Sequence, residues 1–190
     1  MLRPLAADDA AALAAAGASL GKLYTVIPRG VDGARAYIER ALTERDAGQR
    51  VPFAIVWQGA LVGSTSYLDV QRWRWPAGSA WQRSDRPDAV EIGATWLATA
   101  AQRTRCNTEA KYLLLSHAFD VWDVHRASFR TDERNEPSRR AIERLGAALE
   151  GIRRADMPGA DGTVRSSACY SILRAEWPAI RARLAAGLAR

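Results

Sequence analysis

The chain has 190 residues, of which 48% are hydrophobic and 25% charged, as in an ordinary globular protein. We therefore expect one domain over residues 1–190, with a core large enough to fold without disulfides or a metal. Cys106 and Cys169 are too few and too far apart for a disulfide framework or a metal site. The net charge of +6 comes mainly from arginine, and it either favours an anionic ligand or reflects an arginine-rich genome.

The sequence also argues against a membrane or secreted protein. No apolar run approaches the roughly 20 residues that a membrane-spanning helix needs. The N-terminal stretch MLRPLAADDAAALAAAG has no basic region ahead of a continuous apolar core, so it is a poor signal peptide and a reasonable helix. We expect a cytoplasmic protein.

The first half of the chain predicts two helices followed by a hairpin. Asp8 and Asp9 are placed to cap the first helix. β-Branched and aromatic residues on both sides of Gln58–Gly59 indicate a pair of strands joined by a tight turn. The expected elements are helices over 10–16 and 32–46 and strands over 52–57 and 60–68.

Residues 71–88 break this pattern, because they carry too much proline, glycine and charge for a core element. Trp73, Trp75 and Trp81 lie here, alternating with arginines. Such rings suit a cage for an aromatic or nucleotide-like ligand, or they cover a sheet edge. Both interpretations stay open at this point.

The second half of the chain intermixes strands and helices. Pro137 suits the first turn of a helix, and Gly146 suits the position just after its end. The expected elements are strands over 90–97, 127–131, 148–154 and 163–173 and helices over 108–121, 137–145 and 177–188. Together the elements predict an α+β or mixed α/β fold with one central sheet.

A polar loop connects the strand over 90–97 to the next helix. A loop that feeds a helix N-terminus presents unpaired backbone N–H groups, and the helix dipole also favours an anion such as a pyrophosphate. Arginines in the loop are able to add charge-assisted bonds. The candidate residues are Gln102, Arg103, Thr104, Arg105, Cys106, Asn107 and Thr108.

The stretch from Glu91 to Gly146 resembles the acetyl-CoA-binding half of the GNAT N-acetyltransferases, most closely their RimJ/RimL-like branch. The likeness rests on NTEAKYLLLSHAF after the polar loop and on NEPS before AIERLG. In the family's loop pattern Gln102 fits the first position, whereas Arg105 and Asn107 stand where small residues are expected. The resemblance implies a twisted mixed sheet of six or seven strands flanked by helices.

The resemblance also implies an activity. Acetyl-CoA would be the co-substrate, and its acetyl group would pass to a primary amine by direct attack in a ternary complex. Glu91 would lie at the acceptor and act as general base, directly or through a water; its alternative is an exposed strand end. The backbone of Trp96, Leu97 and Ala98 would pair with the pantetheine arm and polarise the thioester carbonyl.

The family's second motif implies roles for Asn135 and Ser138. Asn135 would bond the pantetheine or cap the helix, and Ser138 would lie near the sulfur. Many relatives place a tyrosine acid where this chain has Ile142. Ser138, Tyr170 and water are therefore the alternatives for protonating the departing thiolate.

The acceptor stays open among small molecules, aminoacyl compounds or peptides, and protein N-termini. Arg105 and the missing tyrosine keep a second class in view, a GNAT-like module that binds CoA or RNA without catalysis. No DNA-binding motif is present. His117 and His125 are expected to have structural or surface roles, and no metal is expected. A homodimer is an open alternative to a monomer.

Overall fold

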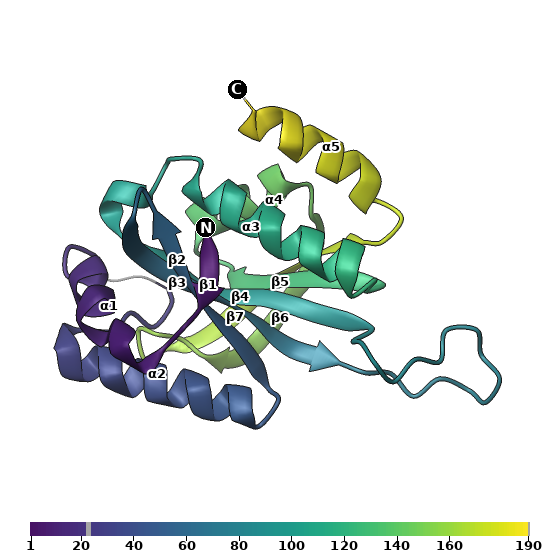
Figure 1. Cartoon of the computed structure of the whole chain (residues 1–190), viewed down its shortest axis with the longest axis horizontal. Helices are drawn as coiled ribbons and strands as arrows, with labels where there is room; N and C mark the ends of the chain where they lie inside the picture. Colours follow the sequence, from purple (N-terminus) through teal and green to yellow (C-terminus); the bar gives the residue numbers. More distant parts are fainter. Residues whose placement is uncertain (22–23, 190) are drawn as a thin grey trace.

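One open, mixed sheet of seven strands organises the chain, in the order β1-β2-β3-β4-β5-β7-β6 (Figure 1). The computed structural model describes residues 1–21 and 24–189. The strands are β1 (Leu2–Pro4), β2 (Arg50–Trp57), β3 (Ala60–Gln71), β4 (Ala89–Leu97), β5 (Arg126–Asp132), β6 (Ala148–Pro158) and β7 (Val164–Leu173). The helices are α1 (Ala10–Gly17), α2 (Gly30–Asp46), α3 (Cys106–Ser116), α4 (Glu136–Leu145) and α5 (Trp177–Leu188). The predicted mixed α/β class and the predicted strand number are confirmed.

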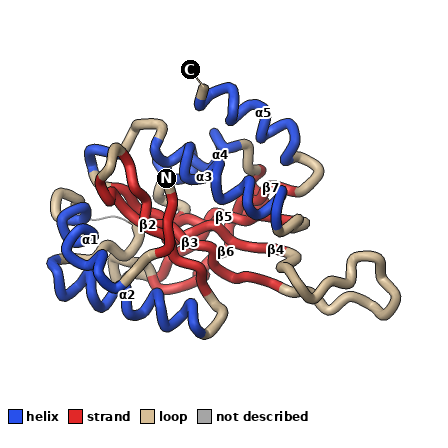
Figure 2. The backbone as a smooth tube through the Cα atoms, viewed as in Figure 1, coloured by secondary structure: helices blue, strands red, loops and turns tan. Residues whose placement is uncertain are grey.

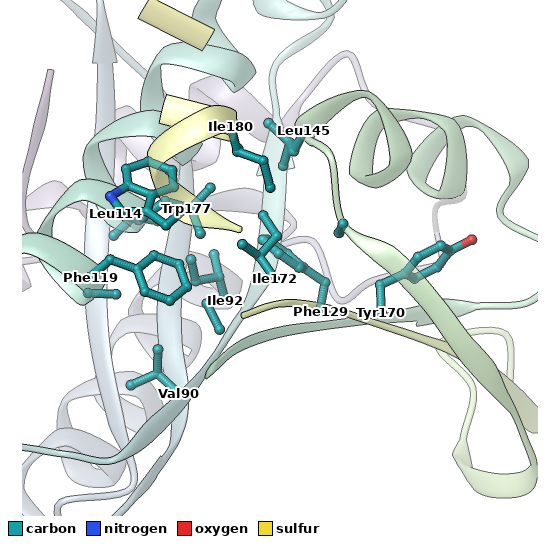
Figure 3. Close-up of a cluster of buried hydrophobic side chains, with 14 of the residues drawn as sticks. Val90, Ile92, Leu114, Phe119, Phe129, Leu145, Tyr170, Ile172, Trp177 and Ile180 are labelled. Atoms are coloured by element: carbon teal, nitrogen blue, oxygen red, sulfur yellow. The ribbon is translucent and has the colours of Figure 1, made fainter. Parts of the chain in front are cut away.

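Helices pack on both faces of this sheet (Figure 1). Side chains of α1 and α2, such as Leu13 and Ile38, form one core with Ala54 of β2 and Trp96 of β4. The larger core lies on the other face, between the strands and α3, α4 and α5 (Figure 3). Its members include Val90, Ile92, Phe129 and Ile172 from strands and Leu114, Leu145, Trp177 and Ile180 from helices. No helix among the described residues is long and apolar enough to cross a bilayer.

Local turn and cap signals are confirmed where they were strongest. Gln58 and Gly59 both adopt left-handed dihedrals, with φ of 50° and 82°, as a tight hairpin turn requires. Gly146 ends α4 in a left-handed conformation with φ of 98°. Asn135 caps the same helix by accepting the Ser138 N–H at 3.2 Å.

The structure differs from the predicted elements in three places. Strand β1 was not expected, and it pairs with β2. The Asp9 carboxylate accepts the Ala6 N–H and pairs with Arg3 of β1, and it does not cap α1. Helix α3 begins at Cys106 and gives way to a π-helical turn at His117–Val121. Strand β1 depends on pairing with a distant strand, which a local pattern does not contain.

The two central strands, β4 and β5, diverge within the sheet. Their parallel pairing covers three positions and ends at Glu91↔Ser128. Beyond Glu91, β4 stays paired with β3 as far as Leu97. Because parallel strands run in the same direction, the opening lies at their carboxyl ends, where α3 and α4 follow, and ligands commonly bind at such a place.

A bulge lies in β4 beside this opening. The register moves from Ser66↔Gly93 to Ser64↔Trp96, so β4 has one residue more than β3 here. Ala94 in the bulge has a left-handed φ of 49°. The bulge redirects the backbone of β4 at the point where it has lost β5 as a neighbour.

Candidate active site

The polar loop before α3 is fixed by its own side chains. The Thr104 hydroxyl donates to the Ala101 carbonyl at 2.7 Å and accepts the Cys106 N–H at 3.2 Å. Gln102 Nε2 donates to the Leu97 carbonyl at 2.9 Å. The Glu109 N–H donates to the Arg105 carbonyl, which starts the helical ladder. The amides of the first turn of α3 therefore point out of its N-terminus, as an anion site requires.

The departures from the family's loop pattern cause no backbone strain. Arg105 has a right-handed φ of −69°, and Asn107 lies inside α3, so neither position needs glycine. The left-handed residue of the loop is Arg103, with φ of 58°. The Arg105 guanidinium donates to the Leu188 carbonyl at 3.0 Å, beside a groove that Thr108 also lines. In this structure Arg105 thus bonds the end of α5.

Cys106 is buried at the start of α3, and burial raises the pKa of its thiol to about 11. A protonated, buried thiol is a poor nucleophile. Cys106 therefore contributes to the site through its backbone and its packing.

The end of β4 offers fewer free backbone groups than expected. The Ala98 N–H donates to the Val62 carbonyl of β3 at 2.6 Å, and the Leu97 carbonyl accepts Gln102. The side chain of Trp96 is buried in the core beneath α1 and α2. The backbone N–H groups of successive residues in a strand point alternately toward one neighbouring strand and the other. Because the Ala98 N–H points to β3, the Leu97 N–H points away from β3, toward the opening.

Glu91 lies where β4 and β5 part. It is only 8% exposed, which excludes the alternative of an exposed strand end. Burial raises the pKa of its carboxyl, and nearby Asp69 adds to that, whereas Arg130 at 3.2 Å opposes it. A Cβ atom at Gly93 would lie 3.2 Å from the Glu91 Oε1 atom and 2.9 Å from the Leu68 side chain, so a larger residue there would displace these side chains. A buried carboxyl with a raised pKa is more basic than an exposed one, which suits it to accept a proton.

The sequence did not single out the charged groups around Glu91. Arg130 of β5 and Asp156 of β6 lie 3.5 Å apart at the closest atoms, and Arg165 of β7 is half-buried nearby. The alternation of Arg126, Ser128 and Arg130 in β5 was the available signal, since a polar stripe within a central strand points to a polar site. Among the described residues, no group of His, Cys, Asp and Glu is placed to hold a metal ion.

Comparison with known proteins decides the family. Residues 1–148 match the sequence family described as the acetyltransferase (GNAT) domain. The chain belongs to the GNAT acetyltransferases. Its activity is therefore acetyl transfer, with acetyl-CoA as co-substrate, as the resemblance of the sequence implied. No curated protein matches the chain.

Solved structures of other acetyltransferases have the same fold. A protein from T. thermophilus, provisionally assigned as an acetyltransferase, is 33% identical, with a TM-score of 0.77 and coverage of 98% of this chain and 92% of that one. A GCN5-related N-acetyltransferase from Brucella melitensis is 27% identical, with a TM-score of 0.79 and coverage of 97% and 80%. Mycobacterium smegmatis RimJ in complex with CoA-disulfide is 22% identical, with a TM-score of 0.75 and coverage of 98% and 88%, and shows likeness of fold.

The site of this GNAT acetyltransferase fits acetyl-CoA. The first-turn amides of α3 would hold the pyrophosphate, and the unpaired edge of β4 up to Leu97 would meet the pantetheine arm. Asn135 is occupied as the cap of α4, which is the simpler of its two predicted roles. Acetyl-CoA would supply the activated acetyl group to this site.

The two side chains that are candidates for the acid differ in their surroundings. The Tyr170 side chain is buried beneath α4; its hydroxyl donates to Glu143 at 2.9 Å and accepts from Arg139 Nε at 3.0 Å. Burial raises the pKa of Tyr170. Ser138 is half-buried at the start of α4, and its hydroxyl bonds none of the described residues. Ser138 is thus freer to act than Tyr170, which two charged groups already hold.

The tryptophans of residues 71–88 gather around one histidine, in a loop that extends beyond the sheet (Figure 2). Trp73 stacks on His125, and Trp75 and Trp81 meet its ring edge-on, with centroids 4.9–5.5 Å apart. Trp75 Nε1 also donates to the buried Asp88 at 2.9 Å. The loop joins the strand ends opposite the opening beyond Glu91. An acceptor-binding role for these rings stays a prediction.

A pair of substitutions separates packing from acceptor binding. We expect Trp75→Ala to lower the unfolding free energy by about 3 kcal/mol, because the ring and its bond to Asp88 are lost. Trp81 is 46% exposed, so Trp81→Ala should cost much less stability. Denaturant unfolding and acceptor kinetics check both variants. If Trp81→Ala instead raises the acceptor KM about 5- to 150-fold with unchanged stability, the rings bind the acceptor.

Proposed function

We propose that the chain is an N-acetyltransferase in which Glu91 deprotonates a primary amine as the amine attacks the thioester carbon of acetyl-CoA. The new bond joins amine nitrogen to acetyl carbon, the carbon–sulfur bond breaks, and the thiolate takes a proton to leave as CoA. The observation that carries the proposal is a buried carboxyl of raised pKa at the point where β4 and β5 part. A direct transfer needs no acyl-enzyme, and the buried Cys106 thiol offers none.

Ser138 is our proposed acid for the departing thiolate, with water as the alternative. It lies in the first turn of α4, whose N-terminus follows the carboxyl end of β5. A hydroxyl has little tendency to ionise, so its help is modest and geometric, and the helix N-terminus also favours the negative sulfur. Tyr170 would first have to leave Arg139 and Glu143.

The acceptor that we propose is an amine of a small molecule, an aminoacyl compound or peptide, or a protein N-terminus. The names of two similar structures, RimJ and a ribosomal-protein-serine acetyltransferase, support the last choice. These two proteins are 22% and 19% identical to the chain, so they establish a shared fold and not a shared acceptor. We further propose one domain over residues 1–190, action in the cytoplasm without DNA, and either a monomer or a homodimer. CoA release against a panel of these amines identifies the class.

Acetyl-CoA is expected to raise the melting temperature of the protein. It binds the native state and not the unfolded chain, so at 100 times its Kd it stabilises the fold by about 2.7 kcal/mol. A pantetheine fragment without the pyrophosphate should do much less, because it makes no bond to the N-terminus of α3. Equal shifts of the melting temperature from both compounds would contradict the proposed pyrophosphate site at α3. If millimolar acetyl-CoA gave no shift, the proposed function would be wrong.

A further inference from the structure

Arg130 lies between two carboxylates that reach it from different strands. Its Nη2 atom is 3.2 Å from Glu91 of β4, and its Nη1 atom is 3.5 Å from Asp156 of β6. The three side chains are largely removed from water: for the side-chain atoms alone, the exposed fractions are 11% for Glu91, 26% for Arg130 and 3% for Asp156. Charges in such surroundings interact strongly, so each carboxylate affects how firmly Arg130 pairs with the other.

Asp156 reaches this position because β6 is irregular. The register with β7 moves from Arg153↔Ser167 to Met157↔Arg165, which leaves extra residues in β6. Ala155 adopts a left-handed φ of 50°, and its N–H donates to the Ser166 hydroxyl at 3.3 Å. A bulge of this kind redirects a side chain, and bulges are frequent next to active sites. Here the bulge turns a carboxylate inward, although β6 is an edge strand separated from β5 by β7.

We propose that Arg130 and Asp156 are positioning residues for Glu91: Asp156 holds the guanidinium, and the guanidinium holds the catalytic carboxylate and sets how readily it accepts a proton. Our inference rests on the proposed role of Glu91. Neither residue needs to touch the acceptor. Asp156 draws part of the positive charge of Arg130 away from Glu91, so that Glu91 remains basic enough to act.

The charged groups around Glu91 and Asp156 are consistent with these different roles of the two carboxyls. Glu91 faces Asp69 from β3, Arg130 from β5 and Arg165 from β7, and burial dominates in raising its pKa. Burial also acts on Asp156, but a hydrogen bond from Ser167 and the charges of Arg130, Arg153 and Arg165 outweigh it and lower the pKa of Asp156. Asp156 therefore loses its proton more readily than an ordinary aspartate, whereas Glu91 holds its proton more tightly than an ordinary glutamate. Cys169 of β7 also lies near both carboxyls, and burial raises the pKa of its thiol, so it adds no charge.

Two neutral substitutions should move the titration of Glu91 in opposite directions. Arg130→Gln removes a cation and should raise the midpoint by about one pH unit, the lower end of what a close charge does. Asp156→Asn removes an anion, so that Glu91 becomes the only carboxylate paired with Arg130. The titration midpoint of Glu91 should therefore fall. In the double variant the fall caused by Asp156→Asn should shrink, because the residue that transmits it is absent. Charges too far away to act on Glu91 would leave the midpoint unchanged in both variants.

The experiment is a carbon-13 NMR titration of the full chain with labelled glutamate carboxyls, alongside the pH profile of kcat/KM. Glu91→Gln identifies the Glu91 signal by its loss. Arg154→Gln is the matched control, since Arg154 is an exposed arginine near Asp156 in the same strand. It changes net charge as Arg130→Gln does, and it should leave the titration unmoved. Asp156→Glu keeps the charge and should restore the midpoint if Asp156→Asn folds poorly.

Opposite shifts of the Glu91 signal, with none in Arg154→Gln, support the inference. Shifts of the same sign, or shifts no larger than in the control, overturn it. The two readouts also separate this inference from the proposed function. If the NMR midpoints move as expected and the acidic limb of kcat/KM does not follow, the charge coupling of Glu91 to Arg130 and Asp156 stands, but the proposed role of Glu91 as base fails.

Discussion

Replacing Glu91 with glutamine should lower turnover by about 10²-fold or more, the usual scale for losing a general base. The amide keeps the shape of the side chain but cannot take the proton that the attacking amine must lose. Acetyl-CoA affinity should stay near wild type, because Glu91 lies away from the α3 N-terminus. The melting temperature is measured alongside, because the substitution removes a carboxylate that pairs with Arg130. Steady-state kinetics at saturating acetyl-CoA measures the effect.

The pH dependence gives this prediction a sign. Because burial raises the pKa of Glu91, wild-type kcat/KM should fall as the pH drops through that raised value. Glu91→Gln should lose this acidic limb along with most of its rate. Glu39→Gln, at an exposed position of α2, is the control and should match wild type. Wild-type turnover in Glu91→Gln would leave the carboxylate without a chemical role.

Lys111→Met should raise the stability of the protein at pH 7 and flatten its pH dependence. Lys111 of α3 is 5% exposed, and its Nζ atom donates to the hydroxyls of Thr65 at 3.2 Å and Thr95 at 2.5 Å. Among the described residues no carboxylate forms an ion pair with it. Burial alone lowers its pKa to about 7. Methionine fills a similar volume without the ammonium, and Thr65 and Thr95 still bond each other at 2.8 Å.

The direction follows from proton linkage. Between the lowered native pKa of about 7 and the ordinary value of 10.5, the unfolded chain holds a proton on Lys111 that the native chain has lost. Wild-type stability should therefore rise with pH across that window, by up to about 1.4 kcal/mol per pH unit. Urea unfolding from pH 7 to 10 measures the slope, with Arg154→Gln as the control. An equal slope in Lys111→Met would show that the buried amine is not its source.

Features fixed by neighbours in the chain could be read from the sequence. The Gln58–Gly59 turn, the Asn135 cap and Gly146 each depend on the dihedrals or hydrogen bonds of a few consecutive residues. Glu91 could be proposed as the base because it opens a strand in a motif of the family. Its burial, which makes the role chemically reasonable, depends on packing across the sheet.

Features that depend on residues far away in the chain could not be predicted from the sequence. Strand β1 has three residues and exists only through its pairing with β2. Asp156 reaches Arg130 through a bulge whose position depends on the register between β6 and β7. The tryptophans fit packing and binding equally well by composition, and their stacking on His125 depends on where β5 begins. Arg105 suggested an anion contact, yet its guanidinium meets the end of α5.

The central claim is acetyl transfer from acetyl-CoA to an amine at Glu91. Its most direct test incubates the protein with isotopically labelled acetyl-CoA and each amine of the panel, and quantifies free CoA and acetylated amine by mass spectrometry. We predict that at least one amine gains the label in a 1:1 ratio to released CoA, and that Glu91→Gln loses this product by about 10²-fold. Tight binding of acetyl-CoA without acetylated product from any amine would contradict the claim, and would favour a module that binds CoA without catalysis.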